Sequence, residues 1–241
     1  MSAPQVRIFD HPQALFDGAA VEFDARARRA IAEAGRFTVA LSGGSTPKAL
    51  YSELAGQKFA SLPWNKIFFF WGDERHVGPD SPESNYRMVN QALLSKVPVP
   101  AENIFRVRAE GKDAGAVAQD YEKIVRDFFS LKPGQFTRFD LVLLGLGPDG
   151  HTASLFPGSR GLEERQRIFI ANRVEKMDTD RLTFTYPVLN AAACDMFLVS
   201  GPGKKEKVRQ ILEEGLDFPA ARVDPEEGDL LWFLDAAAAG K

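Results

Sequence analysis

Several segments of the chain are apolar on both faces, and stretches with helical periodicity separate them. The strand pattern covers 37–41 (FTVAL), 67–71 (IFFFW) and 141–144 (LVLL), and the helical pattern covers 12–34, about 113–131 and 204–215. A strand that is apolar on both faces has to be buried on both faces, which is typical of parallel sheets covered by helices. We therefore predict a three-layer, doubly wound α/β fold, whose mainly parallel sheet carries helices on both faces.

The length and composition fit one globular unit. The chain has 241 residues, of which 44% are hydrophobic, enough to bury a full core. No internal repeat, low-complexity tract or linker divides it, so we expect a single domain over residues 1–241. The C-terminal stretch 221–240 is predicted to cover an edge of the sheet.

Charge and cysteine content exclude some classes of protein. The net charge is −3. This argues against nucleic acid as the main partner, because nucleic-acid-binding proteins usually carry a basic surface patch or stripe. The single cysteine, Cys194, excludes an internal disulfide, and we expect it to be a buried thiol in a reducing compartment. The N-terminal stretch lacks a signal-peptide pattern, and no apolar run reaches membrane-spanning length. We therefore expect a cytoplasmic protein without nucleic-acid or membrane partners.

Four polar, glycine-containing clusters follow predicted strands. They are SGGSTPK (42–48), GDERH (72–76), GLGPDGH (145–151) and SGPGKK (200–205). In doubly wound sheets the ligand binds outside the carboxyl ends of the strands. One pocket at that edge of the sheet could therefore collect all four clusters.

The cluster 145–150 (GLGPDG) matches the G-x-G-x-x-G pattern of dinucleotide-binding loops. Its context argues against that function, because Pro157 comes too soon for the long helix that should receive the pyrophosphate. Two interpretations stay open. The segment is either an ordinary tight turn or a loop that brings backbone and His151 very close to a ligand.

His151 is the strongest candidate for a general base, because histidine side chains titrate near neutral pH. A lone histidine is also often a surface residue or a satisfied core residue. Asp149 could hold the His151 imidazole or point at the substrate. Of the other two histidines, His11 is expected to be an exposed helix cap, and His76 follows a strand end.

The cluster 42–48 combines two glycines and three hydroxyls with a helix start, at which Ser45 or Thr46 is the expected cap. Free N–H groups at a helix N-terminus form a cradle for anions, although the same pattern fits an ordinary strand-to-helix turn. Arg75 and Lys204 could add positive charge to the same pocket.

Two kinds of catalytic site are missing from the sequence. It contains no G-x-S-x-G nucleophile elbow and no zinc-type spacing of Cys and His. A hydrolase with these motifs would therefore activate water rather than form an acyl-serine.

Taken together and in this order, the four clusters resemble the 6-phosphogluconolactonase family over nearly the whole chain. The resemblance implies hydrolysis of 6-phospho-D-glucono-1,5-lactone to 6-phospho-D-gluconate, the second step of the oxidative pentose phosphate pathway. It also implies a fold shared with glucosamine-6-phosphate deaminases and no required cofactor, and the absence of metal-ligand spacing predicts that no metal is bound. The implied partner is a small sugar-phosphate lactone, and we expect a monomer or weak homo-oligomer.

The resemblance also implies roles for individual residues. His151 in DGHTAS matches the family's catalytic histidine, and Asp149 would orient or polarise it. Arg181 matches an arginine in the family's RLT motif, although the preceding stretch 174–180 (VEKMDTD) lacks the usual prolines. The glycines after 144 would let backbone N–H groups approach the lactone carbonyl. The residues expected to bind substrate or phosphate are Ser42, Gly43, Gly44, Ser45, Thr46, Asp73, Glu74, Arg75, Asn85, Gly147, Gly150, Arg181 and Lys204.

Two alternative functions share the implied fold. A sugar-phosphate isomerase-deaminase would typically have a tyrosine where this chain has Arg75. A non-catalytic sugar-phosphate-sensing regulator would need a DNA-binding segment of ~60 residues before the first strand, which is predicted to begin at residue 6. Both features favour the lactonase.

Overall fold

The main sheet of the computed structural model is fully parallel. The structure describes residues 4–241, so residues 1–3 of the N-terminal stretch in which we expect no signal peptide lie outside it. Within the described residues, seven strands form this sheet in the order β1-β10-β9-β6-β2-β3-β5. Their bounds are β1 (Gln5–Phe9), β10 (Asp229–Asp235), β9 (Cys194–Val199), β6 (Leu141–Leu144), β2 (Phe37–Leu41), β3 (Ile67–Trp71) and β5 (Ile104–Phe105).

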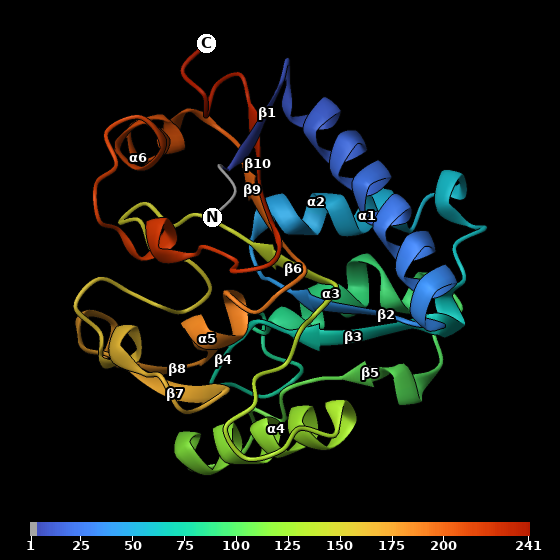
Figure 1. Cartoon of the computed structure of the whole chain (residues 1–241), viewed down its shortest axis with the longest axis vertical. Coiled ribbons are helices and arrows are strands. Elements are labelled where there is room, and N and C mark those ends of the chain that lie inside the picture. The colour runs from blue at the N-terminus through green and yellow to red at the C-terminus, as the bar shows by residue number, and fades with distance from the viewer. Residues whose placement is uncertain (1–3) are drawn as a thin grey trace.

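Helices cover both faces of this sheet, as predicted. Phe23 of α1 (Pro12–Ala34) packs on Phe37 of β2 with ring centroids 5.3 Å apart, whereas Phe128 of α4 (Ala114–Phe129) packs on Phe68 of β3 at 5.2 Å. Phe68 pairs with Thr38, the neighbour of Phe37, so the two aromatic contacts lie on opposite faces. Figure 1 shows the strands between α1 and α4. The three-layer, doubly wound α/β fold is therefore confirmed.

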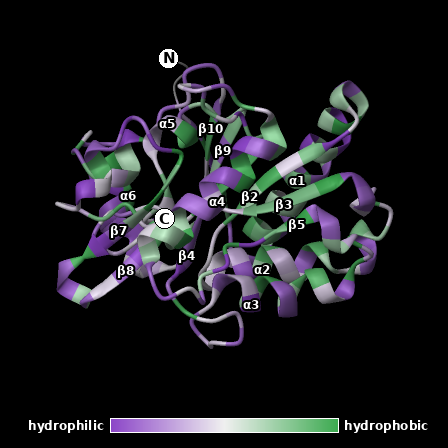
Figure 2. Ribbon diagram, turned by 90° about the horizontal axis from the view of Figure 1, so that it is seen from below, coloured by the Kyte–Doolittle hydropathy of each residue, from purple (hydrophilic) through white to green (hydrophobic). Residues whose placement is uncertain are grey.

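The remaining α-helices are short. They are α2 (Ser45–Leu54), α3 (Asn85–Ala92), α5 (Tyr186–Leu189) and α6 (Lys205–Leu212). Figure 2 shows β2 and β3 coloured largely as hydrophobic, while the helices around them carry many hydrophilic residues. No helix within residues 4–241 is both long and apolar enough to cross a membrane. His11 caps α1, accepting a hydrogen bond from the Ala14 amide at 3.1 Å, and is exposed as predicted.

The C-terminal stretch lies inside the sheet, so the prediction that it covers an edge is wrong. β10 pairs in parallel with β1 on one side and with β9 on the other. Its segment LLWFL (230–234) is buried throughout, and Trp232 stacks on Phe197 of β9 with centroids 4.1 Å apart. This apolar run is a buried central strand, and its flanking acidic and alanine residues obscured that pattern.

A second sheet, which we did not predict, is antiparallel. It contains β4 (Asp73–Arg75), β8 (Thr179–Phe184) and β7 (Phe169–Val174) in that order. β4 follows β3 after Gly72, whose carbonyl accepts a hydrogen bond from the Phe184 amide at 2.9 Å. This contact carries the chain from the parallel sheet into the antiparallel one. The β7–β8 hairpin thereby lies beside the carboxyl ends of the main strands.

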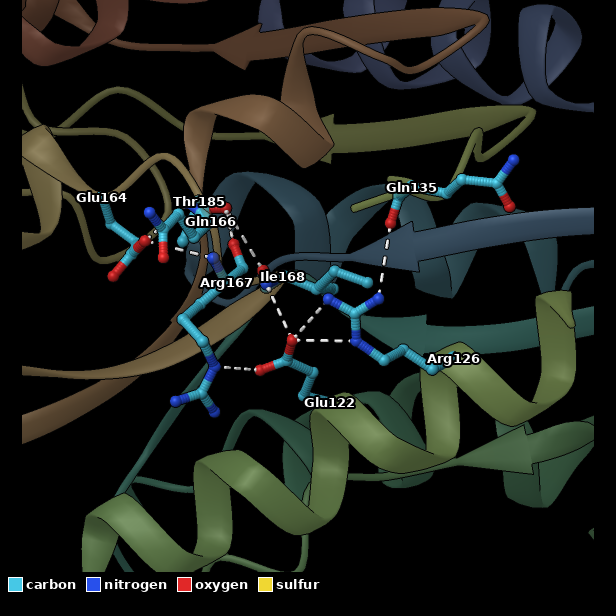
Figure 3. A network of polar contacts seen from close by, with 8 residues as sticks. All are labelled: Glu122, Arg126, Gln135, Glu164, Gln166, Arg167, Ile168 and Thr185. Atoms are coloured by element: carbon cyan, nitrogen blue, oxygen red, sulfur yellow. Dashed lines mark hydrogen bonds and ion pairs between the residues drawn. The ribbon is translucent and has the colours of Figure 1, made fainter. Parts of the chain in front are cut away.

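Glu122 of α4 attaches this second sheet to the helix. Its carboxylate accepts hydrogen bonds from the Arg126 side chain at 3.0 Å and from the Ile168 amide at 3.3 Å, and it pairs with Arg167 (Figure 3). Ile168 immediately precedes β7, so the start of the hairpin is fixed to α4. A buried carboxylate with several donors is tolerated because each partner replaces part of its lost hydration.

Two buried polar residues lie next to each other on β9. The Cys194 thiol is fully buried, as predicted, and burial raises its pKa. Asp195 is also fully buried, between Val142 of β6 and Leu230 of β10, and neither carboxylate oxygen has a hydrogen-bond partner among the described residues. This desolvation raises the pKa of Asp195 well above its ordinary range.

We expect Asp195→Val to stabilise the protein at neutral pH. An unsatisfied buried polar group costs on the order of 1–3 kcal/mol, which corresponds to roughly 2–12 °C in Tm for a chain of this size. Valine is apolar, is larger than aspartate by only about one methylene group, and suits a strand. The measurement is thermal and urea unfolding as a function of pH.

The sign of the pH dependence follows from the raised pKa. Burial favours the protonated form of Asp195 in the folded protein. The folded protein is therefore most stable, as far as this group is concerned, below the unfolded-state pKa of about 3.9. It loses stability as the pH rises from there towards the higher pKa of the folded state. The advantage of Asp195→Val over the unmodified protein should therefore grow as pH increases above about 4. Asp195→Asn is the control, because it removes the ionisation but keeps an unsatisfied polar group. An advantage independent of pH would contradict the buried-acid explanation.

Candidate active site

A cavity of about 330 Å³ lies at the carboxyl ends of the strands, where the four polar clusters meet. Its walls come from the loops after β2, β6 and β9, from β4 and β8, and from the β7–β8 turn. Larger hollows of about 550 and 690 Å³ occur near Asp229 and Arg108, but neither has a histidine in its wall. The described residues contain no group of three or more His, Cys, Asp or Glu side chains that could hold a metal ion.

His151 and Asp149 form a hydrogen-bonded pair in the loop after β6. His151 Nδ1 lies 2.5 Å from Asp149 Oδ1, and His151 lines the cavity. Of the two roles left open for Asp149, the structure therefore shows the one that holds the imidazole. With Nδ1 occupied, Nε2 is the ring nitrogen that has no partner among residues 4–241. A base held by one nitrogen and free at the other can take a proton from a water molecule.

Two glycines of this loop are required by close contacts. A Cβ on Gly147 would lie 2.1 Å from His151 Nδ1, and a Cβ on Gly150 would lie 2.5 Å from the Phe218 ring. Gly150 also has φ of 83°, a left-handed conformation that favours glycine. The loop is therefore built for close approach. The next helical element is only the four-residue 3-10 helix η5 (Arg160–Glu163), in agreement with our argument against a dinucleotide site.

The amides of the same two glycines are not free. The Gly147 amide donates to the His151 carbonyl at 2.8 Å, and the Gly150 amide donates to the Gly147 carbonyl at 3.1 Å. These two amides are therefore engaged within the turn, and the expectation that backbone N–H groups approach a substrate carbonyl stays a prediction for the other residues of the loop. Their function in this structure is to fold the turn that carries His151.

The Asp149 carboxylate lies between the His151 imidazole and the Lys176 ammonium. Its second oxygen, Oδ2, pairs with the Lys176 ammonium from the β7–β8 turn. Partial burial alone would raise the pKa of Asp149, but the hydrogen bonds from Lys176 and His151 outweigh it and lower the pKa to about 2. Asp149 is therefore an anion at neutral pH and a weak base, which leaves His151 as the candidate base.

The turn after β2 has the features of an anion site. Gly44, with φ of 103°, is the N-cap of α2, and no side chain caps this helix, so the predicted cap at Ser45 or Thr46 is wrong. The first amides of α2 are therefore not satisfied by a capping side chain. The Ser42 hydroxyl is buried and has no hydrogen-bond partner among the described residues, and Ser42 lines the cavity. An unpartnered hydroxyl beside an uncapped helix start suits an anionic ligand.

Three cations line the cavity. Arg75 and Arg181 are opposite each other on β4 and β8, and Lys204 donates to the Leu146 carbonyl at 2.7 Å. Burial and the charge of Arg75 lower the pKa of Arg181, which has no ion-pair partner among residues 4–241. Two like charges across a strand pair repel each other. A bound anion would remove this repulsion, so the pair favours an anionic ligand.

Asn85 and Glu74 are outside the cavity wall but contact residues that form it. The Asn85 side chain packs so closely on Gly43 that a Cβ on Gly43 would lie 1.9 Å from Asn85 Oδ1. The side-chain amide of Asn85 donates to the Asp73 carbonyl at 3.0 Å. The Glu74 carboxylate accepts from the amides of Arg75, Asn85 and Tyr86, each at 2.8 Å. Burial raises the pKa of Glu74 in spite of these bonds.

Most of the predicted site residues meet at this cavity. The residues in its wall are Ser42, Gly43, Gly44, Asp73, Arg75, Gly147, His151, Arg181 and Lys204. Those outside the wall are Ser45, Thr46, Glu74, Asn85, Asp149 and Gly150.

Several residues of the site escaped the sequence analysis, and four of them bear directly on the His151–Asp149–Asp73 part of the cavity. Ser154 and Phe156 line the cavity; the Ser154 hydroxyl donates to Asp73 Oδ2 at 2.7 Å, and the Phe156 ring lies 4.2 Å from the His151 ring, centroid to centroid. Both fall within or next to the DGHTAS motif, which was the available signal. Met177 lines the cavity and Lys176 pairs with Asp149, and no sequence signal pointed to either.

Fold and cavity together define an α/β protein whose pocket, at the carboxyl ends of the strands, is lined by three cationic side chains and a histidine. The family model described as glucosamine-6-phosphate isomerases/6-phosphogluconolactonase matches residues 10–232. This chain therefore belongs to that family.

Individual relatives agree with this assignment. The 6-phosphogluconolactonase of Nostoc sp. is 47% identical over 212 residues, which cover 87% of this chain and 86% of the relative. The solved structure of 6-phosphogluconolactonase from Trypanosoma cruzi has a TM-score of 0.89 at 30% identity and covers 100% of this chain and 98% of that chain. A monomeric glucosamine-6-phosphate deaminase, at 22% identity and a TM-score of 0.81 over 98% of this chain and 99% of that chain, shares the fold.

Proposed function

We propose that this protein is an enzyme that hydrolyses 6-phospho-D-glucono-1,5-lactone to 6-phospho-D-gluconate, the second step of the oxidative pentose phosphate pathway. The observation that carries the proposal is the His151–Asp149 pair, at 2.5 Å, in the wall of a cavity that also holds Arg75, Arg181 and Lys204. A base for water and a cradle for phosphate are the two elements that such a substrate requires. The relatives named as 6-phosphogluconolactonases support the same reaction.

The reaction follows from the role given to each group. His151 takes a proton from water, whose oxygen attacks the lactone carbonyl carbon and forms a tetrahedral oxyanion. The carbon–oxygen bond to the ring then breaks, and His151 returns the proton to the departing ring oxygen, which becomes a hydroxyl. Asp149 holds the imidazole and stabilises its protonated form. The cations of the wall stabilise the phosphate and the negative charge that develops on attack.

The ligand's phosphate is assigned to the turn Ser42–Thr46. The uncapped start of α2, the unpartnered Ser42 hydroxyl and the unpaired Arg181 support this assignment. Glu74 and Asn85 act as positioning residues in this proposal, because their polar groups are already bonded to the protein.

We further propose that residues 1–241 act as one cytoplasmic domain, without a cofactor and as a monomer or weak homo-oligomer. The single buried cysteine supports a reducing compartment. The mechanism itself needs only a general base and fixed positive charge.

The proposal is tested by assaying the purified protein on 6-phosphogluconolactone and on glucosamine 6-phosphate. We expect lactone turnover above the spontaneous rate, unaffected by exhaustive chelation, and no release of ammonia from the amino sugar. Deamination without lactone turnover would identify the isomerase-deaminase alternative, and binding without either reaction would identify a non-catalytic module. Activity lost in chelator and restored by one divalent ion would refute the metal-free mechanism.

A further inference from the structure

Lys176 reaches the catalytic pair from a different part of the chain. It lies in the short turn η6 (Glu175–Met177) between β7 and β8 and pairs with Asp149 Oδ2, while His151 Nδ1 occupies Oδ1 at 2.5 Å. Its ammonium also lies 5.5 Å from the centroid of the Phe156 ring, which packs against His151 at 4.2 Å. Lys176 therefore contacts both side chains that hold the imidazole in place.

We propose that Lys176 is a positioning residue that controls, through Asp149, how readily His151 is protonated. The proposal rests on the function proposed above, in which His151 is the general base. An anionic Asp149 favours the protonated imidazole, whereas the Lys176 ammonium on the other oxygen withdraws part of that negative charge and opposes protonation. Lys176 thus keeps His151 in its basic, neutral form at lower pH than an isolated His–Asp pair would.

The other charged groups around His151 act from different positions. Arg75, Arg181 and Lys204 in the cavity wall also oppose protonation, and Asp73 favours it. None of these four makes an ion pair or hydrogen bond with Asp149 among the described residues. Lys176 differs from them because it is outside the cavity wall, so its charge can be removed without changing a group that faces the substrate.

The turn that carries Lys176 also contributes to the cavity wall. Its next residue, Met177, lines the cavity, and Asp178 follows with φ of 47°. The same turn therefore places a positive charge beside Asp149 and an apolar side chain, Met177, in the wall of the cavity.

The experiment uses the histidine resonances of the full protein. The chain has only three histidines, so the imidazole signal of His151 can be assigned with a His151→Ala variant and followed by NMR against pH. This readout needs no substrate. Lys176→Gln removes the charge, and Lys176→Arg retains it. Arg173→Gln is the matched control, because Arg173 is on the same hairpin but pairs with Asp178 and Asp180 instead of Asp149.

We expect the His151 titration midpoint in Lys176→Gln to rise by about half a pH unit, the size typical of one partly exposed charge pair. The acid limb of kcat/KM should move by the same amount, so that kcat/KM one unit below the midpoint falls about threefold while the plateau at high pH is retained. Lys176→Arg and Arg173→Gln should leave both curves in place.

Two results would overturn the inference. An unchanged His151 midpoint in Lys176→Gln would show that Lys176 has no influence on the pair, and an equal shift in Arg173→Gln would show only a general charge effect. If the NMR midpoint of His151 shifts while the acid limb of the kcat/KM profile stays in place, Lys176 does influence His151. That result would contradict the proposed role of His151 as the general base.

Discussion

Replacing His151 with alanine is expected to lower kcat by about 10²–10⁴-fold, the usual contribution of a positioned general base. Water is a poor nucleophile at neutral pH, and the other groups near the loop are unsuited as bases. The pKa of Asp149 is held at about 2, and Glu74 is outside the cavity wall, with its carboxylate bonded to three amides. KM for the phosphorylated lactone should change little, because the residues assigned to the phosphate remain.

The assay must subtract spontaneous lactone opening, so a stopped assay in mildly acidic buffer is suitable. His76→Ala is the control, because His76 is outside the cavity wall and bonds through Nε2 to the Gly111 carbonyl at 2.6 Å. The unmodified enzyme should also lose kcat/KM as pH falls through the range in which histidine is protonated. Near-normal turnover in His151→Ala would show that His151 has only a structural role in the turn, and that Asp149 or Glu74 is the general base.

Removing the phosphate from the substrate is expected to lower kcat/KM by roughly 10²–10⁴-fold. A hydrogen bond to a charged group contributes about 1.5–3 kcal/mol, and two such bonds account for this range. The expected donors are the Ser42 hydroxyl and the first amides of α2, with Arg75, Arg181 or Lys204 nearby. The measurement compares glucono-1,5-lactone with its 6-phosphate under identical conditions.

Two controls link this loss to the cavity. Inorganic phosphate should compete with the phosphorylated lactone and have little effect on the unphosphorylated one. Arg181→Gln should likewise reduce kcat/KM for the phosphorylated lactone more than for the other, since Arg181 has no other ion-pair partner among residues 4–241. Equal turnover of the two lactones would refute the phosphate cradle.

Comparison of individual elements shows how far local patterns reach. α1 occupies the predicted 12–34, because its apolar spacing and its flanking His11 and Gly35 are local signals. The strand β10 was missed because a short apolar run does not by itself distinguish a central strand from an edge cover. The N-cap of α2 was placed one or two residues too late, because Gly44, with a positive φ, is the N-cap where the hydroxyl of Ser45 or Thr46 was expected.

The sequence by itself determined the parallel α/β core, the glycine loop with His151 after β6, and the clusters that line the cavity. These features are written in strands that are apolar on both faces and in motifs a few residues long. Only the tertiary structure decided that Asp149 holds the imidazole, that Lys176 pairs with Asp149, and that Arg75 lies opposite Arg181. The physical reason is that Lys176 is 27 residues away from Asp149 along the chain. Their contact exists because the β7–β8 hairpin, paired with β4 and attached to α4 through Glu122, carries Lys176 back to the carboxyl end of β6.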